Sequence, residues 1–312
     1  MPHQEAEQTF RSYGKEDTEH YTKHRPNYHP SLYKAILDHH TYTGGQLETL
    51  LDVGCGPGSH AVRTLAPHFS HAIGIDPGEG MISAARTLLT TSPIFTKTAG
   101  SIHFQVGSAE QLGQVASRNS VDLITASHAA HWFDMPLFWK SAAEVLKPGG
   151  SVAIWASGEI RINPNIPAGR AIQQTIDAFW GRHFDEFVVP GNEMIKHSYA
   201  DLPLPWTLPE PMDDDDHFEK DTFYRREWSP SESFFDVENA EVSLDKWEKI
   251  MSTGTPVTRW RGAHPGDAGT ERDPLRKCRR AIEKLLHEAG VEEGKETVKG
   301  YTKGVLLMVK RK

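Results

Sequence analysis

The sequence predicts an α/β protein with a mostly parallel sheet of seven strands, helices on both faces of the sheet, an N-terminal arm and an inserted helical lid. Two observations lead to the sheet. From Thr49 to about Trp155, short apolar runs of strand character alternate with helical segments, which is typical of a parallel sheet covered by helices. The first run also ends in a glycine-rich loop, Gly54–Gly58, at the edge where open α/β sheets bind ligands.

The alternating segment contains five expected strands with three helices between them. The strands are Thr49–Val53, His71–Ile75, Ile102–Val106, Val121–Thr125 and Ser151–Trp155. The helices are Gly58–Leu65, Glu79–Leu89 and Phe138–Leu146. Because parallel strands end at the same edge of a sheet, we expect the loops after them to meet there and form a binding site.

After Trp155 the alternation stops, and prolines interrupt the chain as far as residue 209. We expect this stretch to form a lid over the site, and the acidic run Asp213–Asp216 to be a solvated loop. The remaining expected helices are Ala168–Trp180, Ser243–Ser252 and Pro274–Ala289, and the last two strands are Phe218–Trp228 and Tyr301–Val309. We expect one domain over residues 1–312, with its core at about 45–156, 217–230 and 300–310 and its lid at about 1–40, 157–215 and 240–296.

Composition excludes several classes of protein. The chain has 312 residues and a formal net charge of −8, so it lacks the basic surface expected of a protein that binds nucleic acid. Two cysteines, Cys55 and Cys278, indicate a reducing compartment. Met1–Phe10 lacks the features of a secretory signal, and apolar runs such as Val305–Val309 are too short to cross a bilayer. We therefore expect a cytoplasmic protein with no membrane partner; the sequence leaves its oligomeric state open.

The glycine loop indicates which cofactor binds. Its glycines lie at positions 54, 56 and 58, with Cys55 between the first two, whereas a dinucleotide-binding loop has the spacing G-x-G-x-x-G. Gly54, Gly56 and Gly58 let the backbone approach a ligand closely. Asp52 stands two residues before the loop, and a carboxylate suits the ammonium and sulfonium charges of S-adenosylmethionine better than it suits a pyrophosphate. The pattern favours S-adenosylmethionine in a Rossmann-like sheet.

The next two strands end in further candidate cofactor-binding residues. Asp76, at the tip of the second strand, can accept hydrogen bonds from both ribose hydroxyls, or it can cap the following helix. Pro77 follows it, and Met81 can flank the adenine or pack in the core. After the third strand, Ser108 and Ala109 are placed to meet the adenine edge, whereas Glu110 can equally face solvent.

The loop after the fourth strand is expected to face the reacting sulfonium and the acceptor. It contains Ser127, His131 and Trp132. His131 can be a general base for a hydroxyl acceptor, can orient the acceptor, or can be a structural imidazole. Trp132 can wall the site or pack in the core. The seventeen histidines of the chain are scattered, so no metal site is expected.

As a set, Leu51–Gly58, Gly74–Met81, Gly107–Leu112 and Leu146–Gly150 resemble successive motifs of the class I S-adenosylmethionine-dependent methyltransferases. Tyr21–Pro30 and Ala130–Asp134 more narrowly resemble the trans-aconitate methyltransferase-like proteins of fungi. The narrower resemblance implies an arm that folds over the cofactor. Tyr21 can then cover its methionine portion or pack in the core, and Arg25 can bind its carboxylate or form a surface salt bridge. It also implies a small polycarboxylic acid as acceptor and its methyl ester as product.

The acceptor is the open question of the sequence, because residues 160–272 depart most from that family. For a carboxylate acceptor we expect an arginine of the lid, with Arg161 as one candidate, and Trp260 as a stacking surface. The aromatic residues of the lid are also compatible with an aromatic secondary metabolite methylated on oxygen, nitrogen or sulfur. A third alternative is a protein that binds the cofactor without transferring the methyl group.

Overall fold

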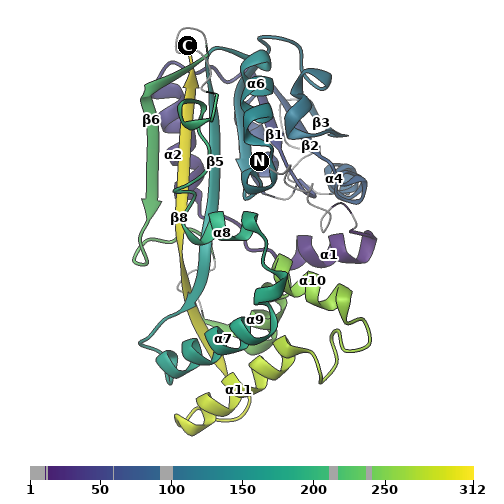
Figure 1. Ribbon diagram of the computed structural model, residues 1–312, viewed down its shortest axis with the longest axis vertical. Coiled ribbons are helices and arrows are strands. Elements are labelled where there is room, and N and C mark those ends of the chain that lie inside the picture. Colours follow the sequence, from purple (N-terminus) through teal and green to yellow (C-terminus); the bar gives the residue numbers. More distant parts are fainter. Residues whose placement is uncertain (1–10, 12, 59, 92–100, 211–216, 237–240) are drawn as a thin grey trace.

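The computed structural model describes residues 11, 13–58, 60–91, 101–210, 217–236 and 241–312. The run Asp213–Asp216 lies outside this part of the chain. Its helices and strands form a sheet flanked by helices, and a helical layer at one end (Figure 1). The α-helices of this part of the chain are α1 (Lys15–His24), α2 (Pro30–Tyr42), α3 (Ala61–Leu65), α4 (Glu79–Thr91), α6 (Met135–Val145), α7 (Gly169–His183), α8 (Pro190–Lys196), α9 (Leu244–Met251), α10 (Thr255–Ala263) and α11 (Pro274–Glu288).

The sheet has eight strands in the described part of the chain, in the order β3-β2-β1-β4-β5-β8-β6, with β7 paired to β8. The strands are β1 (Thr49–Val53), β2 (His71–Asp76), β3 (Ser101–Val106), β4 (Val121–Ser127), β5 (Leu146–Ile162), β6 (Phe218–Trp228), β7 (Glu241–Ser243) and β8 (Thr297–Arg311). The pairs from β3 to β5 are parallel, and β8 runs antiparallel to both β5 and β6. The predicted mostly parallel α/β sheet is confirmed.

The expected number of seven strands was one too few. The additional strand, β7, has three residues, and it pairs with Thr297–Lys299 at the beginning of β8. That pairing is possible because β8 starts at Thr297, four residues before the predicted Tyr301, and so extends beyond the core of the sheet. Strand β5 likewise continues to Ile162 instead of ending at Trp155. The two long strands carry the sheet into the helical layer (Figure 1).

Most predicted helices are present with shifted ends. Helix α6 begins at Met135, three residues before the predicted Phe138, because Asp134 caps it: the carboxylate accepts a hydrogen bond from the Leu137 amide. It ends at Val145 because Leu146 already belongs to β5. The sequence did not delimit α8 and α10, which are short and have a proline at their first and second position, respectively.

Three hydrophobic clusters hold these layers together. One contains Phe138 and Trp139 of α6, and a second contains Leu32 and Ile36 of α2. Since both clusters also contain residues of the central strands, they are the cores on the two faces of the sheet. The third belongs to the helical layer, where α7, α9 and α11 pack around Ile282 and similar residues (Figure 1).

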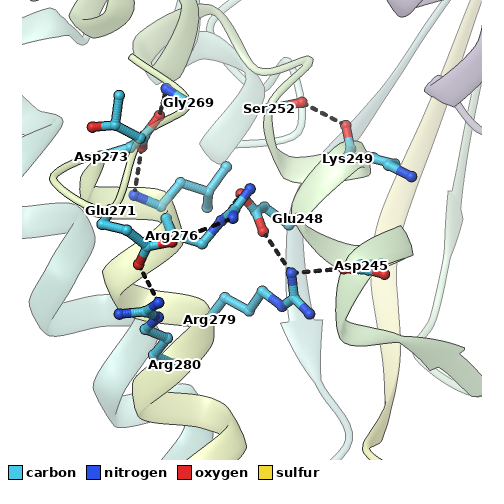
Figure 2. A network of polar contacts seen from close by, with 12 residues as sticks. Asp245, Glu248, Lys249, Ser252, Gly269, Glu271, Asp273, Arg276, Arg279 and Arg280 are labelled. Atoms are coloured by element: carbon cyan, nitrogen blue, oxygen red, sulfur yellow. Dashed lines mark hydrogen bonds and ion pairs between the residues drawn. The ribbon is translucent and has the colours of Figure 1, made fainter. Parts of the chain in front are cut away.

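A buried carboxylate fixes α9 against α11 in this layer (Figure 2). Glu248 of α9 is 7% exposed, and its two oxygens lie 2.8 Å from Nε of Arg276 and 3.3 Å from Nη1 of Arg279. Asp245 lies 2.6 Å from the same nitrogen of Arg279. Because the carboxylate of Glu248 bonds two cations of α11, the two helices are tied by charge as well as by apolar contact.

Candidate functional site

The glycine loop after β1 turns sharply. Gly54 and Gly56 have φ of 70° and 55°, a left-handed backbone conformation that residues other than glycine rarely adopt. A Cβ on Gly54 would lie 2.6 Å from Cβ of Ala129, whereas a Cβ on Gly56 would meet nothing within 4 Å. The loop therefore packs closely against the segment after β4 and leaves open space beside Gly56.

Asp76 joins the tip of β2 to this loop. Its Oδ2 accepts a hydrogen bond from the Gly56 amide at 3.0 Å, and its Oδ1 accepts one from the Gly78 amide at 2.8 Å. The Gly78 contact is the helix-capping alternative considered for this residue. Burial raises the pKa of Asp76 to about 6, against the opposing effect of the two amides. Each carboxylate oxygen keeps a second lone pair for a ligand hydroxyl.

The structure gathers thirteen of the predicted site residues around one cavity of ≈ 230 Å³ at the carboxyl edge of the parallel strands. They are Tyr21, Arg25, Gly54, Gly56, Asp76, Pro77, Met81, Ser108, Ala109, Glu110, Ser127, His131 and Trp132. Two of them also have contacts with the surrounding protein. Met81 is 2% exposed, and Oε1 of Glu110 accepts a hydrogen bond from the Asp134 amide at 3.0 Å.

Three predicted residues lie behind the cavity. Asp52 is 1% exposed, and its Oδ1 accepts a 2.6 Å hydrogen bond from the Thr125 hydroxyl of β4. Burial raises the pKa of Asp52 to about 7, so this carboxyl is a weak source of negative charge. Cys55 donates its amide hydrogen to Ile75 at 2.9 Å, and a Cβ on Gly58 would lie 2.7 Å from the Phe104 ring. These residues shape the loop without lining the cavity.

The two lid residues expected to bind the acceptor are elsewhere. Arg161 donates from Nη1 and Nη2 to both oxygens of Asp177, at 2.9 and 3.2 Å, on an exposed surface. Trp260 is 7% exposed and stacks on His264 with 4.5 Å between ring centroids. Neither lines the cavity, because Arg161 of β5 is paired with Asp177 of α7 and Trp260 of α10 is stacked on His264.

The arm reaches the cavity through the end of α1. The guanidinium of Arg25 lies 5.7 Å from the centroid of the Tyr21 ring, within the range of a cation–π contact. Arg25 is half-buried and has no ion pair with a carboxylate among the described residues. A cation in this state can bind an anionic ligand group. Tyr28, three residues on, is 5% exposed and packs edge-on against Trp155, so it belongs to the core.

Two histidines line the cavity from the loop after β4, the buried His131 and the half-buried His128. Nδ1 of His131 lies 2.7 Å from the Tyr199 hydroxyl. Burial, followed by the charge of Arg25, lowers the pKa of His131 to about 3. The neighbouring His128 has a φ of 53°, and burial likewise lowers its pKa. Both imidazoles are therefore neutral near pH 7.

The lid contributes cavity residues that sequence reasoning missed. They are Asn192 and Ile195 of α8, and Thr253, Gly254, Thr255 and Pro256 around the start of α10. Nδ2 of Asn192 donates to Oγ1 of Thr255 at 2.9 Å and so joins the two parts of the lid. The sequence signal for these two helices was the proline near the start of each, Pro190 and Pro256. A proline does not reveal that the start of α8 lies against the start of α10. Arg11 and His128 also line the cavity.

Searches for two other kinds of site were negative over the described residues. No helix there is long and apolar enough to cross a membrane. No group of three or more histidine, cysteine, aspartate or glutamate side chains there could hold a metal ion.

Comparisons with known proteins agree with this geometry. A family model described as a methyltransferase domain matches residues 51–154. A protein of Dictyostelium discoideum named as a methyltransferase is 28% identical over 239 residues, or 74% of this chain and 82% of its own length. A Saccharomyces cerevisiae protein named as an S-adenosylmethionine-dependent methyltransferase is 30% identical over 45% of each chain. This chain therefore spans less than half the length of the yeast relative.

Among solved structures, one from Anaeromyxobacter dehalogenans, named as a type II methyltransferase, has the same fold. It covers 92% of this chain and 96% of its own, with a TM-score of 0.56 and 21% identity. The family match spans β1 to β5, and the carboxyl ends and following loops of β1 to β4 line the cavity.

Proposed function

We propose that this protein, which is a class I S-adenosylmethionine-dependent methyltransferase, methylates a small molecule bound beneath the lid. The main support is the set of elements that form the cavity. The loops after β1, β2 and β3 form one end, the loop after β4 and the starts of α8 and α10 form the other. The arm lies between them, because Arg25 also adjoins Thr253 and Gly254. A donor at the first end and an acceptor at the second would meet inside one enclosed space.

The residues at the first end fit the cofactor. Asp76 offers two carboxylate oxygens to ribose hydroxyls, and the open space beside Gly56 admits the ligand backbone. Arg25 offers a guanidinium without a carboxylate partner to the methionine carboxylate. Met81 and the segment at Ser108 and Ala109 would surround the adenine. When bound, S-adenosylmethionine supplies an electrophilic methyl group on a sulfonium.

The chain contributes alignment and exclusion of water. The lid closes over the cavity where Asn192 bonds to Thr255, and this contact fixes the acceptor wall opposite the sulfonium position. His131 presents a neutral imidazole held by Tyr199. With a pKa of about 3 the imidazole is a weak proton acceptor, so we assign to it the orientation of the acceptor by hydrogen bonding. As the oxygen of a hydroxyl acceptor bonds to the methyl group and the bond from methyl to sulfur breaks, the hydroxyl proton would pass to solvent.

The charges around the cavity favour a neutral hydroxyl acceptor over a polycarboxylic acid. Arg11 and Arg25 are the cationic side chains among the described lining residues, and Arg25 is assigned to the cofactor. A second lid arginine, Arg261, is engaged by Asp273 at 2.8 Å. A small tricarboxylate would therefore enter with few partners for its charge. Methylation of a carboxylate remains the alternative, and it needs no base because that group is already ionised.

The two acceptor classes can be separated by methyl transfer. The protein is incubated with S-adenosylmethionine carrying a tritiated methyl group and either trans-aconitate or a panel of small phenols. We expect label in the phenol products and none in trans-aconitate. Label in trans-aconitate would reverse the choice of acceptor. Binding of S-adenosylhomocysteine with no transfer to either panel or to a metabolite extract would indicate the non-catalytic alternative.

A further inference from the structure

The acceptor end of the cavity adjoins two smaller cavities. The first, of ≈ 100 Å³, shares Arg25, Thr253 and Gly254 with the main cavity. The second, of ≈ 50 Å³, shares Pro26, Ile160, Phe235, Ile250 and Met251 with the first. The shared walls place the three spaces in a row, from the reacting end of the site toward the extended ends of β5 and β8.

The lining of the two smaller cavities is mostly apolar, with Ser157 and Thr253 on the first and Tyr301 and Thr302 on the second as its uncharged polar residues. Among the described residues, Arg25 is the one charged side chain on the first, and none lines the second. The hydroxyl of Thr302 is committed to the backbone carbonyls of Gly158 and Glu159, at 3.0 and 3.1 Å. A water molecule needs two to four polar partners to be stable in a cavity, so these spaces suit hydrocarbon better than water.

The walls are held in place by the surrounding structure. Trp247, Ile250 and Met251 of α9 face the smaller cavities, while Glu248 of the same helix is bound to Arg276 and Arg279 of α11 (Figure 2). The opposite wall is the long β5–β8 pair, in which Ile160 is in register with Thr302. Because interiors are normally packed without such spaces, a rigid apolar space beside a reaction site points to a ligand group that fills it.

We infer that the two smaller cavities, hereafter the annex, bind a hydrocarbon arm of the acceptor. This inference rests on the proposed function and deepens it: the acceptor is a hydroxyl compound whose apolar chain leaves the reacting group past Arg25 and runs between α9 and the β5–β8 pair. The annex would then select acceptors by the length of that chain, because each buried methylene adds favourable transfer free energy.

The test uses 4-alkylphenols with chains from methyl to octyl as probes. Their affinity is measured by calorimetry in the presence of saturating S-adenosylhomocysteine, so that the cofactor end is filled. We expect affinity to rise about fourfold for each added methylene until the annex is full, and then to level off. In Met251→Trp, which fills the annex, the rise should stop at a shorter chain, with unchanged affinity for S-adenosylhomocysteine.

The matched control is Leu285→Trp. Leu285 of α11 packs against the same hydrophobic cluster but lines neither annex cavity, so this variant should keep the wild-type dependence on chain length. If Met251→Trp does not fold, Ile250→Phe replaces it. The inference about the annex would be wrong if affinity did not change with chain length, or if Met251→Trp left that dependence unchanged. If the wild-type protein did not bind S-adenosylhomocysteine, the proposed function itself would be wrong.

Discussion

Nδ1 of His131 lies 2.7 Å from the hydroxyl oxygen of Tyr199, and both side chains are almost fully buried. Tyr199 has a φ of 55°, a conformation unusual for a bulky residue. It lies in the segment after α8, whereas His131 lies after β4. The contact therefore ties the segment after α8 to the loop after β4 that lines the cavity.

Tyr199→Phe removes this contact from both rings. We expect the free energy of unfolding to fall by about 1–3 kcal/mol, because a buried ring nitrogen loses a partner, and turnover to fall while S-adenosylhomocysteine affinity stays constant. Chemical denaturation, calorimetry and initial rates measure the three quantities. Tyr224→Phe, on β6, is the control. Equal turnover in the two variants would mean that Tyr199 has no part in positioning His131.

The pH dependence of turnover tests the state of His131. Because the folded pKa is lowered to about 3 from 6.5, the unfolded chain binds this proton more readily. The contribution of His131 to stability is thus complete above about pH 6.5 and is lost as the pH falls toward 3. We expect wild type and His131→Ala to have rate profiles of the same shape between pH 6 and 8. A limb near 6.5 that disappears in His131→Ala would restore it as a general base.

Asp76→Ala should weaken S-adenosylhomocysteine binding by about 1.5–3 kcal/mol, the range for hydrogen bonds to a charged group. Ribose hydroxyls favour the ionised carboxylate, so wild-type affinity should be constant above about pH 6 and fall below it. The stability of the protein without ligand depends on pH in the opposite direction. Its folded pKa lies above the ordinary 3.8, so this group's contribution to stability decreases as the pH rises from about 4 to 6.

Asp122→Ala provides the matched control for Asp76→Ala. Asp122 is also buried, and its Oδ2 accepts a hydrogen bond from the Thr49 amide at 2.8 Å. Because Thr49 begins β1, this contact lies at the opposite edge of the sheet from the cavity. The control should lose stability but keep its affinity for S-adenosylhomocysteine. If Asp76→Ala behaved in the same way, Asp76 would be a structural cap only.

Arg25→Gln should weaken cofactor binding by roughly tenfold or more, because the methionine carboxylate would lose a charge-assisted hydrogen bond. Arg161→Gln is the control, since Arg161 is paired to Asp177 on the surface and such pairs contribute little. Calorimetry with S-adenosylhomocysteine compares the two. An Arg25→Gln variant that binds S-adenosylhomocysteine normally but has a raised KM for the acceptor would assign Arg25 to the acceptor instead.

Removal of the arm should cost both affinity for the cofactor and turnover. The cut has to end before Pro26, because Tyr28 is buried against Trp155 and other core rings. Deleting residues 1–24 removes Tyr21 with the rest of α1 and leaves this core intact. We expect a cooperative unfolding transition with weaker S-adenosylhomocysteine binding. Full activity in the truncated protein would show that the arm takes no part in the site.

Glu248→Gln tests the polar network between α9 and α11 (Figure 2). Arg276 and Arg279 keep other acidic neighbours, Glu271 and Asp245, so we expect a loss of about 1–3 kcal/mol in the free energy of unfolding. Glu288→Gln, which breaks an exposed pair with Lys284, should change it by less than about 0.5 kcal/mol. Denaturant titration measures both. Equal effects would mean that burial adds nothing to the Glu248 pairs.

The sequence by itself determined the sheet and the cofactor end of the cavity. Each signal there is local: the period of an apolar strand, the glycines of the loop after it, and Asp76 at the tip of the next strand. Parallel topology then brings the strand ends to one edge, so residues such as Asp76, Ser108 and His131 meet without any knowledge of packing.

Only the tertiary structure decided the acceptor end. The side chain of Asp52 could point to a ligand or to the neighbouring strand. It bonds to Thr125 because of the face of β1 on which it lies and because β4 is the strand beside it. Arg161 and Trp260 have the right chemistry for a ligand, but lid packing gives them Asp177 and His264 as partners. The meeting of Asn192 with Thr255 joins positions 63 residues apart, and no local pattern encodes such a contact, because it is set by how separate helices pack against one another.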